Sequence, residues 1–94
     1  MSREAYRQKI ESRIEEGRAK LMEARAKAKG ASADTRIEAE EQIRKLEKKL
    51  DAAKRKLRDV GDAAEDAWED LTKSLDDAWS DFSGGIKDVF ARFK

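Results

Sequence analysis

A segment near the end of the chain repeats every eleven residues: Glu65-Asp-Ala-Trp-Glu-Asp-Leu-Thr-Lys-Ser-Leu75 is followed by Asp76-Asp-Ala-Trp-Ser-Asp-Phe-Ser-Gly-Gly-Ile86 and by a shorter third copy, Lys87-Asp-Val-Phe-Ala-Arg-Phe-Lys94. Each residue of an α-helix advances about 100° around the axis, so eleven residues return close to their starting angle. The repeat therefore predicts a helix with one apolar stripe, which holds five of the six aromatic residues of the chain. The rest of its circumference is mostly carboxylate.

The same stripe extends through the rest of the chain. Counted from Tyr6, nearly all large apolar residues return to one arc about 100° wide, and only Met22 and Ile37 lie clearly outside it. We predict that this arc is an interaction stripe. Its members are Tyr6, Ile10, Ile14, Leu21, Ile43, Leu46, Leu50, Leu57, Val60, Trp68, Leu71, Leu75, Trp79, Phe82, Ile86, Phe90 and Phe93.

Two arrangements of helices are consistent with this stripe, and both are all-α. Because a loop has no reason to preserve phase, the shared phase favours continuity, and we predict an elongated amphipathic helix or helices in a coiled-coil-like assembly. The alternative is an antiparallel three-helix bundle broken near residues 30–34 and 61–62, since its stripes over 6–28, 37–60 and 64–86 would have nearly equal lengths.

Each candidate break has local signals. Gly30 could end a helix, with Thr35-x-x-Glu38 as the capping box of the next one, and Asp62 followed by Glu65 also has the pattern of a cap. Equally, Ala31 and Thr35 could be small seam positions at which two helices approach closely. Ser2 can cap the first helix.

Composition limits the chain to one thin domain. It has 94 residues, of which 38% are hydrophobic and 46% charged, and it contains no proline. We predict a single helical, coiled-coil-like domain over residues 1–83, basic over 1–61 and acidic over 62–83. Ser83-Gly84-Gly85 weakens the helix by about 1 kcal/mol per glycine. Residues 84–94 are therefore predicted to form a more mobile amphipathic tail.

Charge is separated along the chain. Residues 42–58 contain eight Lys/Arg and two Asp/Glu, whereas residues 62–81 contain eight Asp/Glu and one Lys. The two segments can neutralise each other between antiparallel or staggered chains, or when one chain folds back on itself.

The composition argues against catalysis. The chain has no histidine and no cysteine, so the usual general base and the strongest nucleophile are missing. Carboxylate pairs such as Asp62/Asp66 and Asp77/Asp81 fit a solvated acidic face better than a calcium site. We expect no enzyme, no cofactor, no metal and no small-molecule substrate. Without a signal-peptide-like or membrane-spanning apolar run, we expect a cytoplasmic protein.

The motif Ala64-Glu-Asp-Ala-Trp-Glu-Asp-Leu71, its echo at Leu75-Asp-Asp-Ala-Trp-Ser-Asp-Phe82 and the stretch Glu41-Gln-Ile-Arg-Lys-Leu46 resemble a group of small bacterial coiled-coil proteins of uncharacterised function. This resemblance implies a helical architecture and no catalytic or binding residues. The eleven-residue repeat is also similar in pattern to exchangeable apolipoproteins.

The predicted function is that of a non-enzymatic structural or interaction protein, which self-associates or pairs with another helix through the apolar stripe. One alternative is a coat on a lipid or granule surface, although the acidic polar face is unusual for a helix that binds anionic membranes. A further alternative is nucleic-acid binding through residues 42–58. It is weaker because those cations surround the helix and lack aromatic neighbours.

Overall fold

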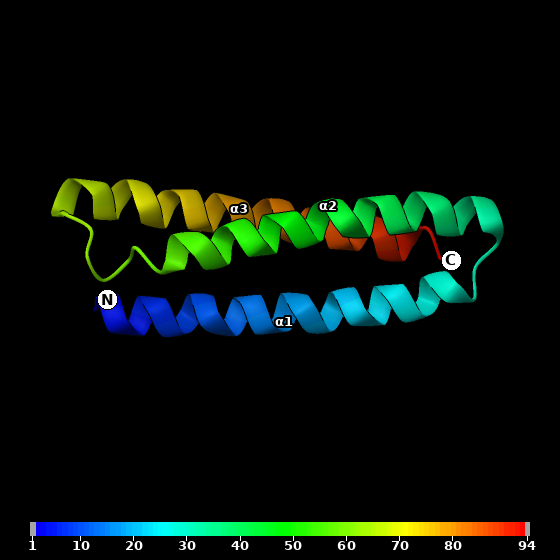
Figure 1. Cartoon of the computed structure of the whole chain (residues 1–94), viewed down its shortest axis with the longest axis horizontal. Helices are drawn as coiled ribbons and strands as arrows, with labels where there is room; N and C mark the ends of the chain where they lie inside the picture. The colour runs from blue at the N-terminus through cyan, green and yellow to red at the C-terminus, as the bar shows by residue number, and fades with distance from the viewer. Residues whose placement is uncertain (1, 94) are drawn as a thin grey trace.

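The computed structural model describes residues 2–93 and contains three helices: α1 (Arg3–Lys29), α2 (Ala33–Leu57) and α3 (Glu65–Ala91). The chain runs along the bundle, back, and along it again, so α2 is antiparallel to both other helices (Figure 1). Residues 2–93 contain no strand. The bundle measures 49 × 17 × 17 Å. The prediction of an elongated all-α protein is confirmed, in the form of the three-helix arrangement.

Two reversals replace the single continuous helix that the phase argument favoured. Residues 30–32 connect α1 to α2, and residues 58–64 connect α2 to α3. A lone helix would leave its whole apolar stripe in water. A stripe on each of the three segments is consistent with both arrangements, because each helix of a bundle also needs an apolar stripe that faces the common core.

The caps only partly follow the predicted signals. Ser2 caps α1 as expected, because its Oγ accepts a hydrogen bond from the Ala5 N–H at 3.1 Å. Gly30 also ends α1. The prediction of a capping box at Thr35 was wrong, because the N-cap of α2 is Ser32. The prediction of a cap at Asp62 was also wrong, because the N-cap of α3 is Ala64. Neither of these two N-caps makes a side-chain capping bond, so packing rather than capping holds the starts of α2 and α3.

The predicted tail forms the last turns of α3. The helix continues through Gly84 and Gly85, and Ile86 and Val89 behind them are buried. A Cβ atom on Gly85 would lie 2.6 Å from Leu46 Cδ2, whereas a Cβ on Gly84 would have no neighbour within 4 Å. Gly85 therefore permits close contact between α2 and α3. The greater mobility of this segment stays a prediction, and Met1 and Lys94 lie outside the described residues.

The core consists of two apolar clusters along the bundle. The first, near the start of α1, is made of Tyr6, Ile10, Ile14, Leu57, Val60 and Leu75, with Ala53, Trp68 and Leu71 packed against it. The second is made of Leu21, Ala24, Ile43, Leu46, Leu50, Phe82, Ile86 and Val89, with Trp79, Phe90 and Phe93 packed against it. Between them Gly17 makes room for neighbouring side chains, because a Cβ there would lie 3.0 Å from Leu50 Cδ2 and 3.1 Å from Phe82 Cε1.

Candidate interaction surface

The predicted interaction stripe is mostly the core of the chain itself. Twelve of its residues are buried: Tyr6, Ile10, Ile14, Leu21, Ile43, Leu46, Leu50, Leu57, Val60, Leu75, Phe82 and Ile86. The other five are partly buried: Trp68, Leu71, Trp79, Phe90 and Phe93. The structure thus brings the whole stripe together within one chain. Met22 and Ile37, the two residues placed outside the stripe, are 70% and 61% exposed.

Val89 is a core residue that the stripe omits. It is fully buried, whereas the equivalent position of the earlier repeats holds Ala67, which is exposed, and Ala78, which is partly buried. Eleven residues at about 100° each exceed three full turns by about 20°. The position held by Ala67, Ala78 and Val89 is therefore rotated further toward the core in each successive repeat. The change from alanine to valine in the third repeat was the available signal.

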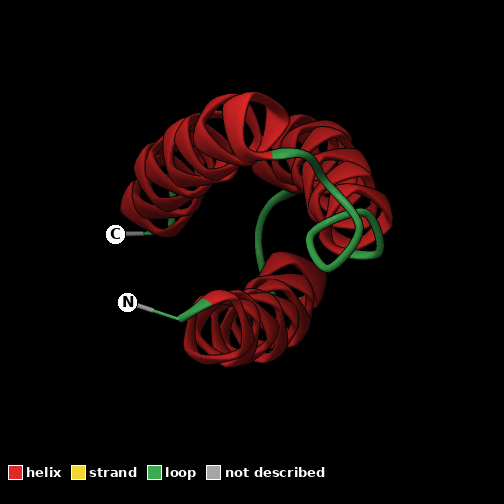
Figure 2. Cartoon of the chain, turned by 90° about the vertical axis from the view of Figure 1, so that its left-hand side faces the viewer, coloured by secondary structure: helices red, strands yellow, loops and turns green. Residues whose placement is uncertain are grey.

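Trp68, Trp79 and Phe90 occupy the same position in the three repeats, and their rings face α1. Each ring lies beneath a cationic side chain of that helix. Arg3 lies 4.9 Å from the centre of the Trp68 ring and Arg13 lies 5.6 Å from that of Trp79. Lys27 lies 5.1 Å from the centre of the Phe90 ring. An end-on view shows the three helices in an arc, with α1 and α3 at its two ends (Figure 2). The aromatic repeat therefore provides the side of α3 that packs toward α1.

A polar network joins α1 and α3 beside Trp68. The Tyr6 hydroxyl lies 3.0 Å from the carbonyl oxygen of Thr72 and 3.1 Å from Asp76 Oδ1, and donates its proton between these acceptors. Arg13 pairs with the same carboxylate at 3.2 Å. Burial, followed by the hydrogen bond to Asp76 and its charge, raises the pKa of Tyr6 to about 12. The phenol therefore stays protonated at neutral pH and acts as a structural hydrogen-bond donor.

Folding turns the charge separation along the chain into a separation across the bundle. Helix α3 has eight Asp/Glu and two Lys, whereas α1 has nine Lys/Arg and five Glu. The repeat also aligns five exposed aspartates on the outer face of α3, which we call the acidic stripe: Asp66, Asp70, Asp77, Asp81 and Asp88. Within residues 2–93, none of the five lies within 4 Å of a Lys or Arg nitrogen.

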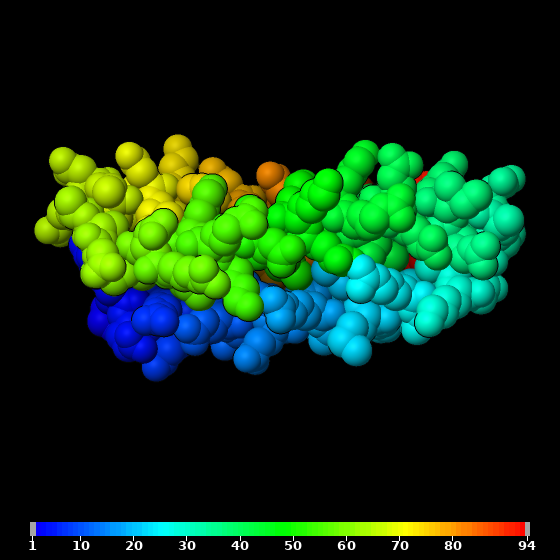
Figure 3. All heavy atoms as spheres, viewed as in Figure 1, coloured from blue at the N-terminus to red at the C-terminus, as the bar shows by residue number. Residues whose placement is uncertain are grey.

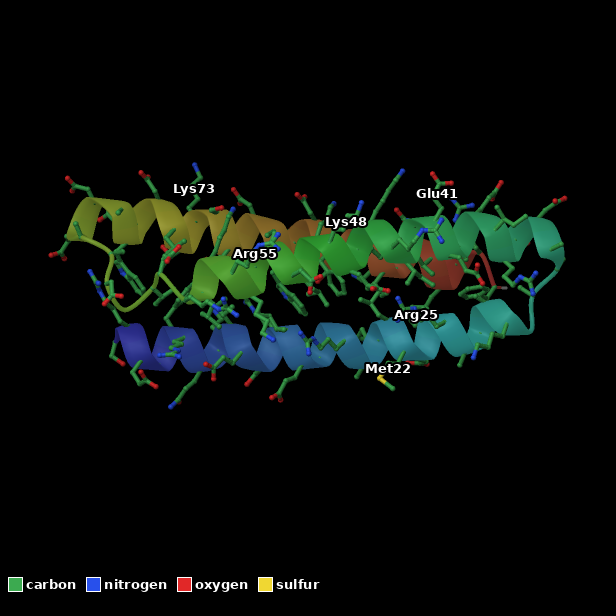
Figure 4. The ribbon with its side chains drawn as sticks, in the orientation of Figure 1. Met22, Arg25, Glu41, Lys48, Arg55 and Lys73 are labelled. Carbon is green, nitrogen blue, oxygen red and sulfur yellow. The ribbon has the colours of Figure 1, made fainter. Side chains whose placement is uncertain are left out.

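The predicted neutralisation between residues 42–58 and 62–81 takes a weaker form. The two segments lie on adjacent antiparallel helices, as folding back requires, but in the described part of the chain no ion pair joins them. Lys56 of α2 instead donates to Ser74 Oγ of α3 at 2.6 Å, and Glu38 of α2 pairs with Arg92, the residue that follows α3, at 2.7 Å. Lys73 extends outward from α3, on the far side of the bundle from Met22 on α1 (Figure 4).

A basic groove lies between α1 and α2, which pack along each other on the face shown in Figure 3. Its volume is about 360 Å³, and Ile14 and Leu57 contribute its apolar lining. Its charged lining residues are Arg7, Glu11, Glu15, Arg18, Lys54 and Arg58. Arg7 already pairs with Glu11 at 3.2 Å. The cations of residues 42–58 were predicted from the sequence as a possible phosphate contact. Arg7 and Arg18 of α1 were not predicted to take part, because only the fold brings them near Lys54 and Arg58.

Neither metal ligation nor membrane spanning is indicated for the described residues. Residues 2–93 contain no group of three Asp or Glu side chains placed to hold a metal ion. None of the three helices contains a segment apolar enough, over sufficient length, to span a bilayer.

Comparisons with known proteins add no relative. No protein-family model, curated protein or solved structure matches the chain. The resemblance to small bacterial coiled-coil proteins therefore stays a prediction.

Proposed function

We propose that the protein is a non-enzymatic structural or interaction module that pairs with another helical chain. The observation that carries this proposal is the acidic stripe of α3, whose five carboxylates are exposed and without a cationic partner in residues 2–93. Opposite charge on a partner raises the rate of encounter and selects its orientation.

The chemistry of the partner follows from the surface that α3 leaves open. Most of the predicted stripe is buried, and its partly buried aromatic residues Trp68, Trp79 and Phe90 face α1 beneath the cations of that helix. The surface of α3 that is open to a partner is therefore the acidic stripe on its outer side. We infer that the partner is a helix with a row of Lys and Arg along one face.

The test measures binding of a fluorescent helical peptide with a row of Lys and Arg along one face, and of a second peptide with Glu at the same positions. Only the basic peptide should bind. Its affinity should fall as salt rises from about 0.01 M to about 1 M, because the Debye length shortens from about 30 Å to about 3 Å.

Two variants with equal net charge identify the surface. Changing Asp66, Asp70, Asp77 and Asp81 of the acidic stripe to Asn should weaken binding at least about tenfold. The matched control changes Glu4, Glu15, Glu16 and Glu23, which are exposed on α1, to Gln and should leave binding almost unchanged. Equal losses in the two variants would mean that net charge alone is recognised, and the proposal would fail.

A second candidate, polyanion binding, is favoured by the cations of α2. Arg44, Lys48, Lys49, Lys54 and Arg55 are exposed and have no ion-pair partner in the described chain. Together with the basic groove they could hold a nucleic-acid backbone. Binding of a mixed-sequence duplex that persists in the acidic-stripe variant and is lost when Lys54 and Arg55 are changed to Gln would support this candidate.

A further inference from the structure

The register of the apolar stripe continues through the connection between α1 and α2, where the folded chain does not require it. Positions spaced three or four residues apart carry only small side chains there: Ala24, Ala28, Ala31, Thr35 and Ala39. Ala24, Ala28 and Ala39 are buried in the bundle. Ala31 lies in the connection, outside both helices, and yet it occupies the next position of the same register. Small residues in such a series allow two helices to approach closely.

Gly30 and Ser32, at the two ends of the connection, differ from a helix mainly in one backbone angle, the ψ of Ser32. Gly30 has right-handed helical angles, with φ −90° and ψ 0°. Ser32 has φ −60°, which is also helical, and departs from a helix through its ψ of 158°. No residue from 2 to 93 has a positive φ, so the reversal uses no left-handed backbone conformation that a helix would have to abandon. Rotation about the ψ of Ser32 is therefore the main change that straightening requires at these two residues, and it breaks no side-chain capping bond of α2, because the Ser32 hydroxyl bonds only to Thr35 Oγ1 at 3.1 Å.

We propose that two copies of the chain exchange α1 through this connection. With residues 30–32 helical, α1 and α2 become one helix from Arg3 to Leu57, and α1 of each copy packs on α2 and α3 of the other. The two long helices cross at the symmetry axis, where Ala28, Ala31 and Thr35 permit close contact. Exchange of an identical element is a low-cost route to a symmetric dimer.

The exchange preserves the contacts of α1. The hydrogen bonds of Tyr6 to Thr72 and Asp76, and the ion pair between Arg25 and Glu47, are re-formed between chains instead of within one. The balance between the closed monomer and the dimer then depends on chain concentration and on the connection alone. This inference does not rest on the acidic stripe of α3.

The decisive variants change only the connection. Ala33 is the first residue of α2, where proline is well tolerated and where the extended Ser32 suits a residue before proline. In the middle of a continuous helix proline removes a hydrogen bond and clashes with the preceding turn. Ala33→Pro should therefore fold as a monomer and abolish the dimer. The double change Gly30→Ala and Ser32→Ala favours a helical connection in both chains and should raise the dimerisation constant at least about tenfold.

The molar mass is measured by light scattering after refolding from denaturant over a range of chain concentrations. The wild type should contain a dimer fraction that rises with concentration. Ala33→Pro should remain monomeric, while circular dichroism shows the same helix content as the wild type. A monomeric double variant at every concentration, or Ala33→Pro that dimerises like the wild type, would overturn the proposal.

A cross-linking assay tests the exchange directly, because the chain has no cysteine. Chains with Arg25→Cys alone are refolded together with chains with Glu47→Cys alone and are then treated with a short bismaleimide, which spans the gap left by two long side chains. Arg25 and Glu47 pair across α1 and α2, so a linked pair of chains should form. Lys73→Cys, on the outside of α3, replaces Glu47→Cys as the collision control and should not link. Equal linking of positions 47 and 73 would contradict the exchange, as would linking that Ala33→Pro does not abolish.

Discussion

Gly84 and Gly85 are neighbours in sequence, but replacing each with alanine should change stability in opposite directions. Both lie within α3, where alanine is favoured over glycine by about 1 kcal/mol. A Cβ at position 84 meets open space, so Gly84→Ala should raise the free energy of unfolding by up to about that amount.

At position 85 the new Cβ collides with Leu46. It would lie 2.6 Å from Leu46 Cδ2 and 3.6 Å from Cδ1. Leu46 is 3% exposed and packs in a cluster with Ile43 and Ile86, so its side chain has little space into which to rotate. An extra methyl group in a packed core costs about 1 to 3 kcal/mol. Because the helix-propensity gain is common to both variants, Gly85→Ala should be less stable than Gly84→Ala by about 1 to 3 kcal/mol.

Urea unfolding followed by circular dichroism and tryptophan emission measures this difference. For a domain of this size each 1 kcal/mol corresponds to about 4 to 8 °C in Tm, so thermal melts should separate the two variants clearly. Combining Gly85→Ala with Leu46→Ala removes the collision, and the double variant should be less destabilised than the sum of the single changes. Gly85→Ala that is as stable as Gly84→Ala would refute the close approach of α2 and α3 at this point.

Two further predictions concern the seam between α1 and α3. The folded pKa of Tyr6 is raised to about 12 from an ordinary value of 10.0, so its contribution to stability is present below pH 10 and is lost as pH rises from about 10 to 12. Unfolding free energies over this range should fall less steeply in Tyr6→Phe, and an identical slope would contradict the buried hydrogen bond. Trp68 and Trp79 are partly buried beneath Arg3 and Arg13, so their emission in buffer should be blue-shifted and unchanged by zwitterionic vesicles. Water-like emission that shifts only with lipid would favour the lipid-surface alternative instead.

The helices and the core were largely predictable because both depend on local periodicity. The stripe from Tyr6 to Phe93 contains most of the large side chains that the structure buries, and Met22 and Ile37 are exposed as predicted. The angle of a side chain around a helix depends only on its position in the sequence. The spacing of apolar residues is the same whether the stripe packs against its own chain or against another chain. The spacing therefore could not distinguish these two arrangements.

The cations above the aromatic rings were not predictable for the same reason. Arg3, Arg13 and Lys27 are spaced by ten and fourteen residues, which matches no repeat of α3. Long side chains reach a ring from several helical positions, so such contacts leave little trace in spacing. The basic groove is similar, because its lining combines α1 and α2 residues that only the reversal at 30–32 brings together.

The eleven-residue repeat has three consequences on three sides of the same helix. One position places Trp68, Trp79 and Phe90 toward α1. A second holds Ala67, Ala78 and Val89, which become progressively more buried, and a third aligns Asp66, Asp77 and Asp88 on the outside. Since the repeat turns by about 20° each time, a fourth copy would carry its aromatic residue further from the core and into solvent. The geometry of the repeat thus limits how long a helix with this sequence pattern can remain packed on two straight partners.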